Sequence, residues 1–133
     1  MDILFLELDE VLEIHQDQIH RYGGSSGVRD MSLLQSALAM PGFGFGDQYF
    51  HEDIFEMATA YLFHIAQNHP FVDGNKRAGA MAAFIFLQMN GIRLASGENS
   101  YEKLVRGAAQ GKTDKSKIAD FFRQHCVKKG VSR

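Results

Sequence analysis

Two prolines, Pro41 and Pro70, are the only ones in 133 residues. Proline breaks the interior of a helix and disfavours helix for the residue before it, so helices in this chain are interrupted rarely and at identifiable places. Apolar residues recur at helical spacing between Leu8 and Tyr22. The chain contains no internal repeat or low-complexity segment. The sequence therefore predicts a compact all-α domain.

Helix start and stop signals divide the chain further. Gly23 and Gly24 end the first helix, and residues 23–27 are expected to form a flexible turn. Small side chains crowd the helix that follows Pro70, which predicts a central buried helix that its neighbours approach closely. The predicted elements are helices over 8–22, from the N-cap Asp30 to Pro41, from about 53 to 68, from 75 or 76 to 91, over 100–110 and over 116–127, with a short extended piece over 92–94.

Composition limits the class of protein. Hydrophobic residues make up 45% and charged residues 23%, enough apolar surface to offset the entropy of ordering one domain over residues 1–133. A formal charge of -2 is not the electrostatic footprint of sequence-independent duplex binding, so no nucleic-acid partner is expected. The single cysteine, Cys126, excludes an intramolecular disulfide and suits a reducing compartment. No signal peptide or bilayer-spanning run is recognisable, and a cytosolic protein without membrane association is expected.

Residues 42–47 alternate glycine with phenylalanine, a pattern that holds a helix poorly. The segment predicts a mobile loop or a small hairpin. Its two phenylalanines, Phe43 and Phe45, either pack into the core or belong to a flap over a cleft, because binding loops are often mobile segments on a rigid scaffold.

The chemistry-bearing segment lies between the two strongest predicted helices and reads His69-Pro70-Phe71-Val72-Asp73-Gly74-Asn75-Lys76-Arg77. Gly74 permits a turn in which consecutive amides point inward as an anion-binding nest. The helix that follows directs its unpaired amides and its positive dipole end to the same place. Lys76 and Arg77 add two cations, which oppose the dipole unless an anion such as phosphate binds there.

His69 and Asp73 are the candidates for proton transfer and metal binding. A histidine is partly neutral near pH 7, so His69 can take the proton from an attacking hydroxyl. Asp73 offers a hard carboxylate, which Mg²⁺ prefers together with phosphate oxygens and water. Phe71 is expected to anchor the loop in the core. The pattern indicates phosphate-ester or nucleotide chemistry, with a structural loop of exposed charges as the alternative.

These nine residues resemble the signature of the Fic/Doc (Fido) family, HPFxDGN followed by a basic or glycine position and Arg. The flanks are similar to the Doc branch of that family, the death-on-curing toxins. The similar flanking features are Arg-Tyr-Gly-Gly at 21–24, Gly-x-Arg-Asp at 27–30, the helix before the motif and the Asn-Gly stop at 90–91. The resemblance spans roughly residues 8–94.

The resemblance implies a Fido-type helical bundle that uses ATP and Mg²⁺ to modify a protein hydroxyl. It makes His69 the catalytic base and Asp73 the Mg²⁺ ligand or phosphate-site acid. It also implies that Gly74 and Asn75 belong to the anion-binding loop and that Lys76 and Arg77 contact the ATP phosphates. By position alone, the flap that aligns the target falls at Phe43, Gly44, Phe45 and Gly46.

Two positions separate the branches of this family. Fic enzymes that transfer AMP usually have glycine where this chain has Lys76, and a second arginine where it has Ala80. Doc-type proteins share the lysine, lack that arginine, and transfer the γ-phosphate to a threonine of elongation factor Tu, which halts translation. The resemblance therefore favours a Doc-like protein kinase toxin. AMP transfer to a protein hydroxyl and a catalytically silent partner-binding module are the alternatives.

The inhibitory Ser/Thr-x-x-x-Glu-Gly/Asn pattern of many Fic proteins is absent from the sequence, and Ala80 leaves its glutamate no arginine to pair with. The resemblance therefore implies restraint from outside, by a Phd-like antitoxin whose partly disordered tail folds into a groove on this domain in the bacterial cytosol.

The remaining candidates have structural explanations. His64 and His69 lack the further ligands that a zinc site needs, and Cys126 is expected to be inert although Lys128 and Lys129 follow it. His15 is expected to be a core histidine with a partner. The histidines expected in loops or on the surface are His20, His51 and His125. The basic carboxyl-terminal part is expected to be a solvated face or a surface for an acidic partner.

Overall fold

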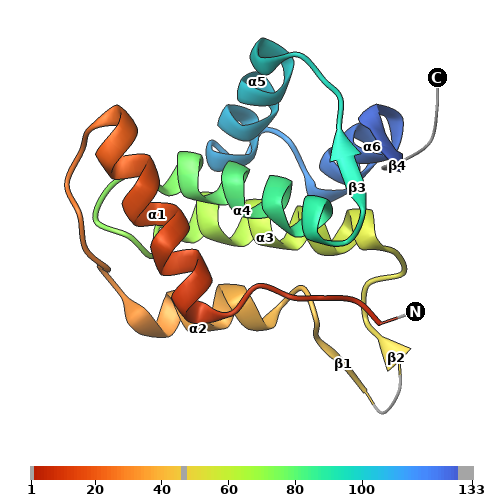
Figure 1. The fold of residues 1–133 in the computed structure, drawn as a ribbon, viewed down its shortest axis with the longest axis horizontal. Helices are drawn as coiled ribbons and strands as arrows, with labels where there is room; N and C mark the ends of the chain where they lie inside the picture. Colours follow the sequence, from red (N-terminus) through yellow and green to blue (C-terminus); the bar gives the residue numbers. More distant parts are fainter. Residues whose placement is uncertain (1, 46–47, 129–133) are drawn as a thin grey trace.

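The computed structural model describes residues 2–45 and 48–128, and Figure 1 shows their arrangement. The helices are α1 (Leu8–Tyr22), α2 (Met31–Ala39), α3 (Ile54–Asn68), α4 (Asn75–Met89), α5 (Glu98–Ala109) and α6 (Lys115–His125). The strands are β1 (Gly44–Phe45), β2 (Gln48–Tyr49), β3 (Ile92–Leu94) and β4 (Cys126–Lys128). The fold is all-α, as the sequence predicted.

Helices α3 and α4 lie side by side at the centre of the molecule (Figure 1) and make its most extensive contact. A Cβ atom at Gly79 would lie 3.0 Å from the Leu62 carbonyl oxygen, so only glycine allows this approach of the two backbones. α1 packs on α4 and α2 packs on α3, while α5 and α6 also pack on the central pair. The prediction of a central helix lined by small residues is confirmed.

The core gathers large side chains from helices far apart in the sequence. Tyr61 and Phe86 from the central pair and Phe122 from α6 are fully buried. The Tyr61 hydroxyl accepts a hydrogen bond of 2.9 Å from the Leu6 amide, which fixes the amino-terminal segment over the core. Burial of the ring raises the pKa of Tyr61 to about 12, so the hydroxyl stays protonated.

Capping residues in the sequence correctly indicated where several helices begin and end. The Asp30 carboxylate accepts a hydrogen bond from the Leu33 amide, and the Asp53 carboxylate accepts one from the Glu56 amide. Gly23 ends α1 with φ 85°. The predicted bounds of α1, α2 and α3 are confirmed within one or two residues.

The last predicted helix extends too far. Helix α6 ends at His125, and Cys126 adopts an extended backbone with φ -99° and ψ 143°. Residues 126–128 form β4, which pairs antiparallel with β3 with Leu94 opposite Cys126. A pattern of local periodicity does not reveal this pairing, because the partner strand lies more than thirty residues earlier in the sequence.

The glycine and phenylalanine segment forms a hairpin, one of its two predicted alternatives. β1 pairs antiparallel with β2, with Gly44 opposite Tyr49. The Phe43 ring is 56% exposed and lies edge-on to the exposed Phe50, so Phe43 does not enter the core. Gly46 lies outside the described residues.

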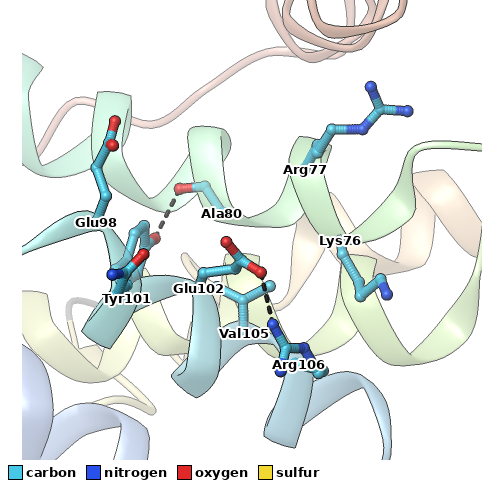
Figure 2. A pocket seen from close by; sticks show the side chains of 9 residues that line it. Lys76, Arg77, Ala80, Glu98, Tyr101, Glu102, Val105 and Arg106 are labelled. Atoms are coloured by element: carbon cyan, nitrogen blue, oxygen red, sulfur yellow. Dashed lines mark hydrogen bonds and ion pairs between the residues drawn. The ribbon is translucent and has the colours of Figure 1, made fainter. Parts of the chain in front are cut away.

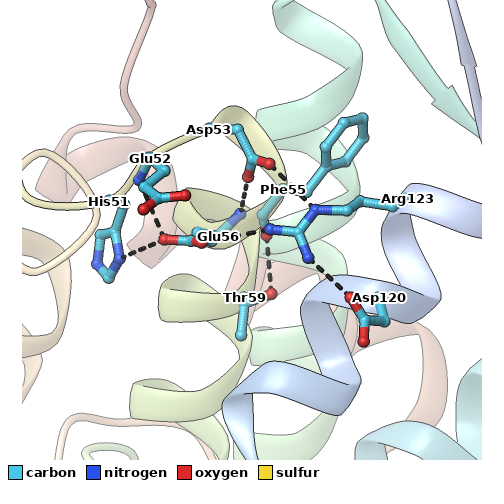
Figure 3. A network of polar contacts seen from close by, with 8 residues as sticks. All are labelled: His51, Glu52, Asp53, Phe55, Glu56, Thr59, Asp120 and Arg123. Carbon is cyan, nitrogen blue, oxygen red and sulfur yellow. Dashed lines mark hydrogen bonds and ion pairs between the residues drawn. The ribbon is translucent and has the colours of Figure 1, made fainter.

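Polar contacts join the start of α3 to α6 (Figure 3). The Arg123 guanidinium is within 3.1 Å of Asp53, 3.3 Å of Glu56 and 2.8 Å of Asp120. Its side chain is more than a third exposed, so the network contributes only about 1 kcal/mol. His51 lies in the loop before α3, one of its two expected places, and its ring is 9% exposed with Nδ1 3.8 Å from Glu56.

None of the helices among the described residues has the length and apolar character needed to cross a membrane.

Candidate functional site

The loop between α3 and α4 lines a cavity of about 320 Å³. The cavity is lined by His69, Val72, Asp73, Gly74, Asn75, Lys76 and Arg77. The structure therefore brings together every motif residue that the sequence assigned to base, metal or phosphate contacts.

His69 has an unusual backbone. It follows the last residue of α3 with φ 52° and ψ 56°, the only non-glycine residue with positive φ in the described part of the chain. The left-handed conformation costs a non-glycine residue about 1–2 kcal/mol, and such strain persists only where surrounding contacts determine it. The side chain is exposed and lines the cavity.

The Asn75 side chain holds the loop together and does not face an anion. Its Oδ1 accepts a hydrogen bond of 2.9 Å from the Phe71 amide, and its Nδ2 donates one of 3.0 Å to the Phe71 carbonyl. The Phe71 ring is 1% exposed, as predicted for an anchor in the core. The Asn75 side chain therefore fixes the shape of the motif loop, which leaves its backbone amide as the group that it can offer to an anion.

His15 completes that anchor from α1. Its ring stacks on Phe71 at a centroid distance of 3.8 Å and an interplanar angle of 4°. Its Nε2 donates a hydrogen bond of 2.7 Å to the Asp73 carbonyl. The prediction of a buried histidine with a partner is confirmed, and that partner belongs to the motif loop.

The Asp73 carboxylate is exposed and already accepts two backbone hydrogen bonds. Oδ2 accepts from the Ser25 amide at 3.1 Å, and Oδ1 accepts from the Gly74 amide at 2.8 Å. These two amides, with a smaller contribution from the Arg77 charge, hold the pKa of Asp73 below its ordinary value of 3.8. Asp73 is therefore ionised at neutral pH.

One ionised, exposed carboxylate beside an anion-binding helix start fits Mg²⁺. This ion is usually held by one or two carboxylates together with substrate phosphates and water. Among the described residues no group of three His, Cys, Asp or Glu side chains could hold a metal by itself. Among the described residues of the motif cavity, Asp73 is the carboxylate that could hold Mg²⁺ together with phosphate oxygens and water.

The start of α4 offers amides to an anion. Gly74 adopts φ 75° and begins the helix without a side-chain cap. The first amides of a helix have no carbonyl partner within the helix. Together with the positive end of the helix dipole they favour a bound phosphate.

Lys76 and Arg77 are not equivalent. The Arg77 guanidinium donates hydrogen bonds to the carbonyls of Gln18, at 3.3 Å, and Gly23, at 3.0 Å, at the carboxyl-terminal end of α1. The positive charge of Arg77 therefore interacts favourably with the negative end of the α1 dipole. The exposed Lys76 ammonium has no hydrogen-bond or ion-pair partner within residues 2–45 and 48–128. Lys76 is therefore the motif cation that a phosphate can engage without breaking an existing contact.

A second cavity of about 570 Å³ lies between α4 and α5 and shares Lys76 and Arg77 with the first. Figure 2 shows these two side chains leaving the start of α4 in different directions. Ala80 has an uncharged methyl side chain, and its carbonyl accepts a hydrogen bond of 2.7 Å from the Tyr101 hydroxyl. Glu98 and Glu102 also line the groove, and Glu102 pairs with Arg106.

The segment that the sequence predicted to be a flexible turn braces the motif loop. In addition to the Ser25 contact with Asp73, the Gly27 carbonyl accepts a hydrogen bond of 3.1 Å from the Val72 amide. Gly24 adopts φ 116°, a conformation that favours glycine, and a Cβ atom there would lie 2.7 Å from Asp73 Oδ2. Glycine content alone indicated flexibility, and nothing local in the sequence indicated these contacts.

The hairpin does not lie beside the motif. It precedes α3, whereas the motif loop follows it, and Figure 1 shows β1 and β2 near one end of this helix and the loop between α3 and α4 at the other. Fifteen residues of helix separate them by about 22 Å. None of the described hairpin residues lines the motif cavity.

The other candidate side chains lie outside the motif cavity. Burial raises the pKa of the Cys126 thiol to about 11, so little thiolate forms at neutral pH. His20 is exposed, and His125 is half-buried with its ring 4.3 Å from that of Phe121. His64 Nε2 accepts a hydrogen bond of 3.2 Å from the Lys115 ammonium. Lys129 lies outside the described residues.

Comparisons with known proteins agree with this arrangement. Residues 5–87 match the Fic/DOC family. The chain is 30% identical to the "Protein kinase doc" of Escherichia phage P1 over 116 residues, which is 87% of this chain and 90% of that protein. It is 40% identical to the "Toxin Doc" of Mycolicibacterium smegmatis over 75 residues, 56% of this chain and 58% of that protein. Because the family match and the phage relative both include the whole motif loop and most of the helical bundle, the chain belongs to the Fic/DOC family, in its Doc branch.

Proposed function

We propose that this protein is a Doc-like toxin, an ATP-dependent kinase that transfers the γ-phosphate to a threonine or serine hydroxyl of elongation factor Tu and so halts translation in the bacterial cytosol. The observation that supports this most directly is the cavity in which His69, the start of α4 and the Lys76 ammonium meet. A base and a phosphate-binding helix start within one cavity are what phosphoryl transfer to a hydroxyl requires.

Each motif residue has a part in this reaction. Neutral His69 takes the proton from the attacking hydroxyl. The amides at the start of α4 and the Lys76 ammonium bind the phosphate oxygens and offset the charge that develops on them. Asp73 would hold Mg²⁺, which neutralises phosphate charge when it is bound. Arg77 keeps α1 against the motif loop through its two carbonyl contacts and adds positive charge beside the site.

Ala80 favours phosphoryl transfer over AMP transfer. Its methyl group supplies no charge to a phosphate, and its carbonyl is occupied by Tyr101. The name of the phage relative, a protein kinase, supports the same choice. AMP transfer and a silent binding module are the alternatives that the experiment distinguishes.

A label-transfer assay tests the proposal. Purified protein free of antitoxin is mixed with Mg²⁺, elongation factor Tu and ATP labelled at either the α or the γ phosphate. We expect transfer of the γ label only, and a loss of about 10²–10⁴-fold in the His69→Ala variant. His20→Ala, which removes an exposed histidine outside the cavity, is the matched control and should keep full activity.

Each alternative has its own outcome in this assay. Transfer of the α label identifies an AMP transferase. Absence of both labels, with cell lysate as a second source of targets, together with growth arrest that survives His69→Ala, identifies the silent binding module.

The proposed partner is a Phd-like antitoxin segment that folds on binding. A cavity of about 380 Å³ between α1 and α4 has an apolar base that includes Met81 and Ile85. Acidic side chains also line it, namely Glu10, Glu13 and Asp17. An amphipathic helix with one apolar face and basic flanks complements this surface.

Met81 offers a test of the partner that leaves the motif intact. We expect Met81→Glu to weaken binding of the antitoxin encoded beside the gene by at least tenfold, because it buries a charge against the apolar face of the segment. Phosphoryl transfer by the free protein should be unchanged. Calorimetry with the antitoxin peptide measures the first quantity, and unchanged affinity would rule out this groove.

A further inference from the structure

Arg29 lies outside the motif and contacts the end of α3, where His69 is located. Its Nη2 donates a hydrogen bond of 3.0 Å to the Asn68 carbonyl, and its Nε donates one of 2.7 Å to the His69 carbonyl. Its backbone amide donates one of 2.8 Å to the Pro70 carbonyl. One residue therefore binds three consecutive carbonyls at the turn that sets the direction of the His69 side chain.

These carbonyls need such a partner. The last carbonyls of a helix have no amide partner within it, and a cation at the carboxyl-terminal end also interacts favourably with the helix dipole. His69 additionally holds a left-handed backbone that only surrounding contacts maintain. The Arg29 guanidinium is the charged group that makes those contacts.

Arg29 is itself held in place by the motif loop. The neighbouring Val28 forms a backbone bridge with Phe71, and the Gly27 carbonyl accepts a hydrogen bond from the Val72 amide. On the other side, the Asp30 amide donates to the Pro70 carbonyl while the Asp30 carboxylate caps α2. The guanidinium is thus presented to α3 from a fixed backbone.

We propose that Arg29 is a positioning residue that holds the His69 backbone in its left-handed conformation and so directs the imidazole into the motif cavity. The part of this inference that concerns catalysis rests on the proposed function, whereas the conformational part does not. The planar fork of arginine binds two adjacent carbonyls at once, whereas the single ammonium of lysine binds one of them well. Lysine should therefore restore the function only in part.

The test compares Arg29→Gln and Arg29→Lys with Arg93→Gln. Arg93 is an exposed arginine on β3 and does not line the motif cavity. The Arg93→Gln substitution removes one positive charge, as Arg29→Gln does, but at a position outside the motif cavity. The first readout is the Cα and Cβ chemical shifts of His69, which report its backbone angles without any substrate. We expect both Arg29 variants to move these shifts toward those of an ordinary conformation, with Arg29→Gln moving them further, and Arg93→Gln to leave them unchanged.

The second readout is the kinetics of phosphoryl transfer. We expect kcat to fall by about 10–100-fold in Arg29→Gln and by less in Arg29→Lys. KM for ATP should stay within threefold of the wild type, because the phosphate-binding start of α4 is not touched. A loss confined to KM would overturn the inference, and so would a wild-type kcat in a folded Arg29→Gln variant whose His69 shifts had moved.

The two readouts separate this inference from the proposed function. If the wild-type protein transfers no phosphate to any protein, the proposed function fails and the chemical shifts alone decide on Arg29. Unchanged His69 shifts in both Arg29 variants overturn the positioning role whatever the activity. Arg29→Lys keeps the test usable if Arg29→Gln does not fold.

Discussion

Asp73 is an exposed carboxylate whose ionised form is stabilised by two backbone amides, and this makes its contribution to stability dependent on pH. The folded-state pKa lies below the ordinary value of 3.8, so the contribution is complete above that value and is lost as the pH falls through the folded-state pKa. We expect Asp73→Asn to lower the free energy of unfolding by the same amount at pH 7 and pH 5. The difference from the wild type should shrink below pH 4. Urea titrations at these pH values measure it, and a difference that stays constant below pH 4 would refute the assignment.

Gly24 and Gly23 both have positive φ, but only Gly24 lies against the motif loop. A Cβ atom at Gly24 would meet Asp73 Oδ2 at 2.7 Å, whereas one at Gly23 would meet nothing within 4 Å. We expect Gly23→Ala to cost about 1 kcal/mol from the backbone conformation alone. Gly24→Ala should cost about 2–4 kcal/mol, because the collision with Asp73 is added to that strain.

Urea unfolding of the two glycine variants side by side measures both costs. Equal costs would mean that residues 23–27 can move away from Asp73 without penalty, and would contradict a bracing role for this segment.

At the scale of single residues, the sequence predicted which residues line the motif cavity but not which contacts they make. His69, Asp73 and Lys76 were identified by residue type and by the motif. The carbonyl partners of Arg77 were not predictable, because Gln18 and Gly23 lie more than fifty positions earlier. A contact that depends on how two helices cross leaves no periodic signal in either of them.

At the scale of the helices, α6 contacts α3 through His64, whose imidazole is neutral at pH 7. The Lys115 ammonium lies 3.2 Å from His64 Nε2 and 5.0 Å from the centre of the Phe63 ring. Burial, and next the charges of Lys115 and His51, lower the pKa of His64 from 6.5 to about 4. A folded-state pKa below the unfolded one stabilises the protein above pH 6.5, and this stabilisation is lost as the pH falls toward 4.

Replacing His64 with glutamine tests this junction. Glutamine keeps an acceptor for Lys115 and cannot be protonated, so we expect the free energies of unfolding of His64→Gln and wild type to be close at pH 7.5. At pH 4.5 the wild type should be less stable by about 1–2 kcal/mol, a value reduced to allow for the half-exposed ring. Urea titrations at several pH values measure the difference, in which the other histidines cancel. Parallel pH profiles would exclude His64 as the responsible group.

The helices were predictable from the sequence because their signals are local. Asp30 and Asp53 cap their own helices, and Gly23 ends α1. The pairing of β3 with β4 was not predictable. A strand of three residues is too short to show the alternation of apolar and polar side chains by which strands are recognised. Local helix propensity therefore predicted a helix that continues two residues beyond His125. In the structure, the pairing of residues 126–128 with β3 ends the helix at His125.

In the whole molecule, the cavities to which we assign binding lie along the central helix α4. The motif cavity and the α4–α5 groove meet at Lys76 and Arg77 at the start of α4. The hairpin lies at the other end of α3, beyond direct reach of His69. The flap was predicted from its position in the sequence before α3. That position does not show how far the segment lies from the motif loop, which follows the other end of this helix. A role for this hairpin in target alignment requires that the target extend along the length of α3.

Nucleotide binding should stabilise the whole fold, because a ligand that binds only the folded state raises the free energy of unfolding by mass action. A non-hydrolysable ATP analogue with Mg²⁺ at about one hundred times its Kd contributes about 2.7 kcal/mol, which corresponds to a rise of several degrees in Tm for a domain of this size. We expect Lys76→Ala to remove most of this rise, because the exposed ammonium binds phosphate without a competing partner. Lys112→Ala, at an exposed lysine outside both cavities, should leave it intact. Thermal unfolding with increasing nucleotide measures the effect without any protein substrate. An equal rise in the wild type and Lys76→Ala would mean that the nucleotide binds without Lys76 and would contradict the phosphate contact assigned to it.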